Sequence, residues 1–229
     1  MKQSILFDER FLDRHAGALI TDTAVAVVEL VANAWDAYAS EVKIIWPNHN
    51  SDRRFSIIDN GKGMTADMFD RRWRKLDYNR SAEEGDQVDP PIELKDFGPR
   101  RTYGRNGRGR HAAFRFSDPY IVRTWRDGTE LTYEVRRGTT APFEITLVNT
   151  RNNSKGHGTE ISATSSHGVN MPAEEARQVI GTRFLADPHF RVSIDGTRAF
   201  DEKVESLIVD SHDGANRIQD PHWCKGGQS

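Results

Sequence analysis

The pattern of apolar and polar positions predicts helices early in the chain and mostly strands later. Ala24–Ala39 consists almost entirely of Ala, Val, Leu, Trp and Tyr, and Thr21 or Asp22 precedes it as an N-cap, so we predict a buried helix there. Alternation and turn residues predict the other elements. These are a short helix at 8–15, strands at 42–46 and 55–58, a helix at 67–76 capped by Thr65, helical character at 111–116, strands at 120–125, 129–136, 143–150 and 159–163, a helix at 172–185, and a hairpin of 190–194 with 197–200.

The order of these elements predicts an α+β fold. Two hairpin turns are expected, at Asp127-Gly128 and at Asp195-Gly196. Residues 77–110 form the least regular stretch, and a loop of this length inside a compact domain is usually functional or disordered. Helices, two strands and then an antiparallel run indicate a mixed, mostly antiparallel sheet with helices on one face. The regular strand-helix alternation of a doubly wound fold is missing.

The length of the chain fits one large domain with a short extension. Its 229 residues are 36% hydrophobic, enough for a core of that size. The pattern weakens after residue 200, so we assign the domain to 1–200. Residues 201–229 are then a C-terminal extension or the start of a linker to a further module.

The charge and cysteine content of the chain indicate its cellular compartment but do not indicate its function. The net charge of −2 gives no argument for nucleic acid, although arginines gather at 71–74 and 100–110, where phosphate groups or plain solvent would suit them. No apolar run is long enough for a membrane span, and no secretory signal is expected. The single cysteine, Cys224, makes no intrachain disulfide, so the cytoplasm is the expected compartment.

A polar stripe on the first predicted helix is the sharpest local clue. Glu29, Asn33 and Asp36 are the only strongly polar side chains between Ala24 and Ala39. At about 100° per residue they fall within an arc of roughly 60°. Buried carboxylates need partners, so the stripe is expected to line a polar cavity that holds a cation, water or a ligand. The alternative is a half-exposed helix that turns the three residues to solvent.

Two glycine-containing loops add candidate chemistry. Asp59 ends a strand and is followed by Asn60-Gly61-Lys62-Gly63-Met64, where glycines permit positive φ and the carboxylate can accept hydrogen bonds from an amine. A plain turn or a calcium loop are the other interpretations of this segment. Gly104–Arg110 combines three glycines with three arginines before a possible helix, which suits phosphate binding, or non-specific contact with nucleic acid.

Four segments, taken in order, resemble the GHKL ATPase superfamily of gyrase, heat-shock chaperone, histidine kinase and MutL proteins. Glu29–Ala37 is similar to the N-box of the gyrase, chaperone, MutL and MORC branches, and the chain as a whole is most similar to the chaperone, MutL and MORC-like branches. Asp59–Met64 matches the Asp-x-Gly-x-Gly motif, Gly104–Gly109 matches the end of the ATP lid, and His157–Ile161 resembles the final Gly-Thr motif. The resemblance covers about residues 15–165 well and extends to about 200.

The resemblance implies a Bergerat-type two-layer α/β sandwich with a long ATP lid at about 77–110. It implies that Asp59 accepts the adenine amino group, that Thr159 holds the adenine end through water, and that Asn33 coordinates Mg²⁺. Glu29 is implied as the general base, and Asp36 as a support for the helix and neighbouring loops. The residues implied to bind ATP are Asn33, Asp59, Gly61, Gly63, Met64, Gly104, Asn106, Gly107, Arg108, Gly109, Arg110, His111 and Thr159.

The function expected from this resemblance is Mg-dependent binding of ATP and its slow hydrolysis to ADP and phosphate. Lid closure and a nucleotide-dependent homodimer would switch an attached or separate effector module. The gyrase and MutL branches use a lysine from a following transducer domain, and residues 201–229 are not long enough to be that domain. Arg110-His111 stand where the family often has small or aromatic residues. The alternatives are a nucleotide-binding regulatory module without turnover, and a nucleic-acid-binding protein that uses the arginines of 100–110.

Overall fold

The chain forms one eight-stranded mixed sheet. The computed structural model describes residues 22–48, 53–74, 85–103, 109–138, 143–164, 169–184, 187 and 189–200. The strand order is β10-β9-β1-β2-β8-β5-β6-β7. Only β1 and β9 pair in parallel among these neighbours, and the other pairs are antiparallel. The strands are β1 Glu41–Ile45, β2 Arg54–Asp59, β5 Tyr120–Arg126, β6 Thr129–Arg137, β7 Phe143–Asn152, β8 Gly158–Thr164, β9 Arg191–Ile194 and β10 Thr197–Arg198.

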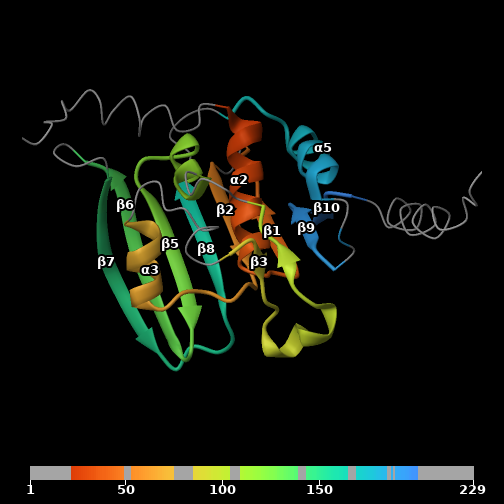
Figure 1. Cartoon of the computed structure of the whole chain (residues 1–229). Helices are drawn as coiled ribbons and strands as arrows, with labels where there is room; N and C mark the ends of the chain where they lie inside the picture. The colour runs from red at the N-terminus through yellow and green to blue at the C-terminus, as the bar shows by residue number, and fades with distance from the viewer. Residues whose placement is uncertain are drawn as a thin grey trace, which may run out of the picture.

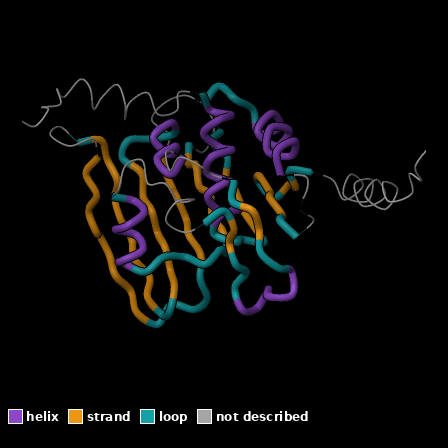
Figure 2. The backbone as a smooth tube through the Cα atoms, in the orientation of Figure 1, coloured by secondary structure: helices purple, strands orange, loops and turns teal. Residues whose placement is uncertain are grey.

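Four helices of the described residues lie on one face of this sheet (Figures 1 and 2). They are α2 Thr23–Asp36, α3 Ala66–Trp73, α5 Ala173–Phe184 and the 3-10 helix η2 Gly109–Arg115. The core lies between this layer and the strands, where Val27 and Val31 of α2 and Phe55 of β2 are fully buried. The α+β prediction, with a mostly antiparallel sheet and helices on one face, is confirmed.

The helix α2 begins and ends at identifiable residues. The Asp22 side chain accepts a hydrogen bond from the Val25 N–H at 3.0 Å, as an N-cap does. The prediction placed the end at Ala39, but the helix stops at Asp36, and Tyr38 takes a positive φ of 59°. The chain therefore turns away from the helix axis immediately after the polar stripe.

The region expected to be irregular, 77–110, contains ordered pieces in its described part. These are β3 Gln87–Val88, the 3-10 helix η1 Ile92–Phe97 and β4 Arg100–Arg101. The Tyr38 hydroxyl donates to the Gly98 carbonyl, and Arg100 donates to the Ala39 carbonyl at 2.5 Å and to Asp187 at 2.9 Å. Long-range contacts therefore hold 98–101 against the end of α2.

Both predicted hairpin turns are confirmed. Asp127 and Gly128 have φ of 51° and 79°, and Asp195 and Gly196 have 50° and 77°, so each pair supplies two positive-φ residues between antiparallel strands. The predicted helix at 8–15 and the extension at 201–229 lie outside the described residues, and the boundary at 200 stays a prediction.

Candidate functional site

The polar stripe of α2 divides into two kinds of environment. Glu29 and Asn33 are half-buried, whereas Asp36 is buried. The Asp36 carboxylate accepts a hydrogen bond from the Tyr103 N–H at 2.7 Å, and Trp35 donates to the Arg101 carbonyl at 2.9 Å. Asp36 thus holds the segment that leads to the glycine-rich loop, which is the supporting role expected for it.

The carboxylate of Glu29 packs against Gly109 at the start of η2. A methyl group on Gly109 would overlap Glu29 Oε2 and lie 3.0 Å from Glu29 Cβ and Cδ. The absence of a side chain at Gly109 is therefore what lets the acid occupy this position. Burial, and then the negative charge of Asp36, raise the pKa of the Glu29 carboxyl above its ordinary value. A raised carboxyl pKa suits a general base.

The amide of Asn33 lies one helical turn from Glu29 on the same face of α2. Its Nδ2 is buried and has no hydrogen-bond partner among the described residues. Native proteins rarely leave such a group unsatisfied, so the amide fits a site that a ligand or water completes.

The carboxylate of Asp59 lies at the end of β2, held by backbone groups. It accepts hydrogen bonds from the N–H groups of Gly61, at 2.8 Å, and Thr159. Burial raises the pKa of Asp59 to about 7, against the lowering effect of those two hydrogen bonds and of His157. The Asp59 carboxyl is therefore a hydrogen-bond acceptor that changes between its ionised and neutral forms near neutral pH.

The loop after Asp59 fits tightly between α2 and the strands. The Lys62 N–H donates to the Ala37 carbonyl at 2.8 Å, and a methyl group on Gly61 would lie 2.7 Å from Ala37 Cβ. Gly63 has φ of 60°, and a methyl group there would overlap the Trp125 carbonyl. Both glycines are therefore required by the close approach of neighbouring atoms, from Ala37 and Asp59 at Gly61 and from the backbone of Trp125 at Gly63, and the loop is fixed in place.

A row of three polar side chains runs across adjacent strands at this end of the sheet. Thr159 of β8 pairs with Asp59 of β2 on one side and with Thr124 of β5 on the other. Directly opposed residues of antiparallel strands share a face, so all three lie on the face covered by helices. Thr124 was missed by the sequence analysis. The available signal was a threonine on the inward face of 120–125, in line with buried Tyr120 and Val122.

Met64 connects the loop after Asp59 to this row of polar side chains. Its backbone N–H donates to Thr124 Oγ1 at 2.9 Å, and its side chain is buried. Asp59, Gly61, Gly63, Met64 and Thr159, all expected from the sequence, are thus brought together.

His111, expected near phosphate, is placed in an aromatic cluster. Its Nδ1 lies 2.9 Å from the Tyr120 hydroxyl, and its ring stacks on Phe143 with centroids 4.3 Å apart. Burial, together with the charge of Arg110, lowers the pKa of His111 to about 3. A neutral, buried imidazole offers no positive charge to a phosphate, so we leave His111 out of the proposed site.

Arg110 is buried at the start of η2, next to the glycine that contacts Glu29. It keeps its place as a candidate phosphate ligand by position. The remaining glycine-loop residues expected to contact ATP, Gly104, Asn106, Gly107 and Arg108, lie outside the described residues.

The raised pKa of Asp59 predicts pH-dependent recognition of the base. Only the ionised carboxylate is a full-strength acceptor for an amine, so affinity for an adenine compound should fall as pH drops below about 7. Between pH 8 and pH 6 we expect a loss of roughly tenfold. Adenosine is the ligand to titrate, because it has no phosphate that ionises in this range. An affinity that does not change between pH 6 and pH 8 would contradict the assignment.

Comparison of the chain with known protein families identifies the family to which most of its length is similar. A sequence profile described as "Histidine kinase-, DNA gyrase B-, and HSP90-like ATPase" matches residues 20–168, more than half of the 229-residue chain. No curated protein matches the chain. Among the helices of the described residues, none has the length and apolar character needed to cross a membrane.

Proposed function

Because this chain belongs to the histidine kinase-, DNA gyrase B- and HSP90-like ATPase family, we propose that it binds ATP with Mg²⁺ and hydrolyses it slowly to ADP and phosphate. The observation that carries the proposal is that both ends of the site are built on one helix. Glu29 and Asn33 face one end, and the loop that follows Asp59 is attached to Ala37. Glu29 and Ala37 are separated by about 12 Å along the helix axis, which suits a nucleotide with folded phosphates.

The adenine end is proposed at Asp59. Its carboxylate accepts two backbone hydrogen bonds and has capacity for a further donor, since a carboxylate has about four lone-pair sites. The exocyclic amine of adenine supplies such a donor. Thr159 lies beside Asp59 on the neighbouring strand and contacts the adenine directly or through water.

The chemical step is proposed at Glu29. A water molecule attacks the γ-phosphorus, the bond from that phosphorus to the bridging oxygen breaks, and ADP leaves with the electron pair. Glu29 takes the proton of the attacking water. The contact with Gly109 fixes the carboxylate, and the raised pKa of Glu29 favours proton uptake. Arg110 and the backbone of the glycine loop would neutralise phosphate charge.

Asn33 is the residue proposed to hold Mg²⁺. Its amide oxygen is a hard ligand of the kind that Mg²⁺ takes, usually as one of few protein ligands together with substrate phosphates. The unpartnered Nδ2 of the same amide is a donor, which a phosphate oxygen or water would satisfy. When bound, the metal neutralises phosphate charge.

Replacing Asn33 by alanine should remove the Mg²⁺-dependent part of ATP affinity, by about tenfold or more. Affinity measured with EDTA in place of Mg²⁺ should stay unchanged, because the base contacts are intact. Asn149→Ala, at an exposed position of β7, is the matched control. A Mg²⁺ effect that survives in Asn33→Ala would exclude Asn33 as the ligand.

Phosphate release at high protein concentration tests turnover itself. Binding of ATP with measurable release supports the hydrolase. Binding without release supports the regulatory module that does not hydrolyse ATP, and a folded chain that binds no ATP contradicts both. The switch role, with lid closure and a nucleotide-dependent homodimer acting on an effector module, rests on the family likeness alone.

Nucleic-acid binding through the arginines of 100–110 gains no support from the described residues. Of the arginines in this range that the structure describes, Arg101 alone is exposed, whereas Arg100 and Arg110 are buried and Arg100 is committed to Asp187 and the Ala39 carbonyl. Buried guanidinium groups of this kind do not form a basic surface for a phosphate backbone.

A further inference from the structure

The hydroxyl of Thr124 has three neighbours, which come from two distant segments of the chain. Thr124 is fully buried, and its Oγ1 lies 2.9 Å from the Met64 nitrogen, 3.1 Å from the Gly158 carbonyl oxygen and 3.3 Å from Thr159 Oγ1. One of these neighbours, Met64, belongs to the loop after Asp59, and the other two belong to the Gly158-Thr159 motif on β8. This one side chain therefore connects the segments that form the adenine end of the proposed site.

The chemistry of these neighbours fixes the direction of every hydrogen bond. A backbone N–H can only donate, so Met64 donates to Thr124. A backbone carbonyl can only accept, so the single proton of Thr124 goes to Gly158. The proton of the remaining contact must then come from Thr159. A hydroxyl with one proton and two lone pairs is fully used by this arrangement.

These directions determine whether the Thr159 hydroxyl can donate a hydrogen bond to a ligand or accept one from it. Its own proton is turned to Thr124, so only the lone pairs of Thr159 Oγ1 are left for a contact with a ligand. Asp59 stands on the neighbouring strand at the same level and is also an acceptor. The floor of the adenine end thus presents acceptors from both residues, which suits the amine of adenine and opposes the carbonyl at the same position of hypoxanthine or guanine.

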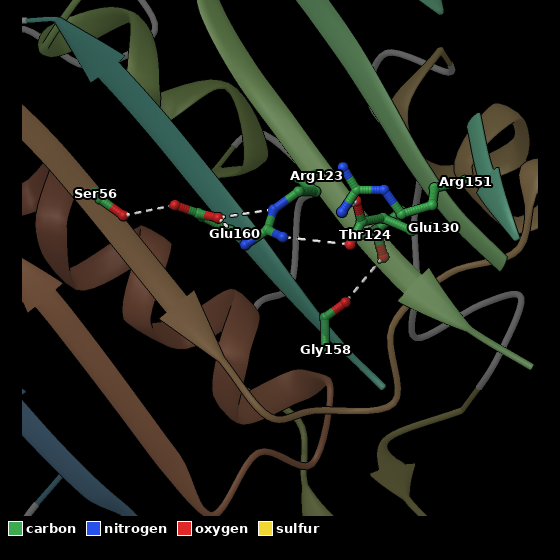
Figure 3. Close-up of polar contacts among 7 residues, drawn as sticks. All are labelled: Ser56, Arg123, Thr124, Glu130, Arg151, Gly158 and Glu160. Atoms are coloured by element: carbon green, nitrogen blue, oxygen red, sulfur yellow. Dashed lines mark hydrogen bonds and ion pairs between the residues drawn. The ribbon is translucent and has the colours of Figure 1, made fainter. Parts of the chain in front are cut away.

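The strand pair that carries this arrangement is fixed from its other face as well. Arg123, the neighbour of Thr124, pairs with Glu160, the neighbour of Thr159, with Arg123 Nε 2.9 Å from Glu160 Oε2. Figure 3 shows this pair within a row of polar contacts from Ser56 to Arg151, and shows Thr124 reaching Gly158. The register of β5 against β8 is therefore held by charge on one face and by Thr124 on the other.

We infer that Thr124 is a positioning residue for base specificity: its hydroxyl turns Thr159 into a hydrogen-bond acceptor and so favours a 6-aminopurine over a 6-oxopurine. The inference rests on the proposed function, because it concerns the base of the nucleotide bound there. It adds a residue that need not touch the nucleotide and that acts through Thr159.

The test is the ratio of the affinities for ATP and inosine triphosphate, measured by calorimetry. The two nucleotides share the sugar and phosphates, so general damage to the fold or the phosphate site leaves the ratio unchanged. In Thr124→Val the Thr159 proton is released to face the ligand, and the ratio should fall by about fivefold. Thr124→Ser keeps the hydroxyl and should stay within about twofold of the wild type.

Thr132→Val makes the same chemical change at a residue whose β6 position pairs with Arg123, on the other face of the sheet, and should not alter the ratio. If Thr124→Val does not fold, Thr124→Cys carries the same test, because a thiol is a weak hydrogen-bond donor and acceptor. A ratio that stays at the wild-type value in folded Thr124→Val or Thr124→Cys overturns the inference. A wild-type chain that binds neither nucleotide overturns the proposed function instead.

A double-mutant cycle with Thr159→Val separates the route through Thr159 from any other. If Thr124 acts through Thr159, Thr124→Val should have no further effect on the ratio once Thr159 is valine. Additive effects would mean that Thr124 does not act through Thr159 and would overturn the mechanism inferred here.

Discussion

Glu29→Gln will lose ATP hydrolysis by about a hundredfold or more while its affinity for Mg·ATP stays within about twofold. Glutamine has the shape of glutamate and can keep the contact with Gly109, but it cannot take a proton from water. The substitution also removes a half-buried carboxylate beside Asp36, so thermal stability should rise rather than fall. Phosphate release gives the rate, and calorimetry gives the affinity.

The matched control for this prediction is Glu41→Gln, which makes the same change at an exposed acid where β1 begins. It should leave hydrolysis unchanged. Gly109→Ala offers an independent approach, because its methyl group would displace the Glu29 carboxylate without altering its chemistry. Hydrolysis that persists at the wild-type rate in Glu29→Gln would remove Glu29 from the mechanism.

Gly63→Ala will destabilise the fold by about 3 kcal/mol and weaken ATP binding. About 1 kcal/mol comes from placing a Cβ at a positive φ, here 60°. The rest comes from overlap with the Trp125 carbonyl and a 3.0 Å approach to the Gly158 carbonyl, both backbone atoms that cannot turn aside. The loop must shift, and the Met64 hydrogen bond to Thr124 shifts with it.

Gly128→Ala separates the two causes. Gly128 also has a positive φ, 79°, but a Cβ there would meet nothing within 4 Å among the described residues. Gly128→Ala should therefore lower the free energy of unfolding only by the cost of a positive φ in alanine, about 1 kcal/mol, and should bind ATP normally. Equal losses of unfolding free energy in the two variants, measured by urea denaturation, would contradict the close approach at Gly63.

The sequence predicted the parts of the site that depend on local pattern. The stripe of Glu29, Asn33 and Asp36 follows from helical spacing, and the structure brings two of its members to half-buried positions on one face. The family membership, inferred from four short segments in order, is confirmed by the match over residues 20–168. Helical period and turn chemistry are local properties, so one sequence was enough to see them.

What the sequence did not predict depends on contacts between distant residues. The ordered pieces within 85–103 are held by Tyr38 and by the Arg100–Asp187 pair, 87 residues apart, and no local pattern announces either. The burial of His111 against Tyr120 and Phe143 likewise arises only when the strands assemble. Thr124 has its inferred positioning role because β5 pairs with β8, and the register of this pair determines which residues Thr124 contacts.

Titration of Mg·ATP into the wild type and Asp59→Asn, side by side in a calorimeter, tests the central claim most directly. Asparagine can replace the acceptor oxygen but adds an amide donor where the carboxylate had none, so one of its groups faces the adenine amine or a backbone N–H with the wrong polarity. We expect the wild type to bind and the folded variant to lose binding by about a hundredfold, the cost of roughly 2.7 kcal/mol. Equal affinity in the two folded proteins would place the nucleotide elsewhere and contradict the account.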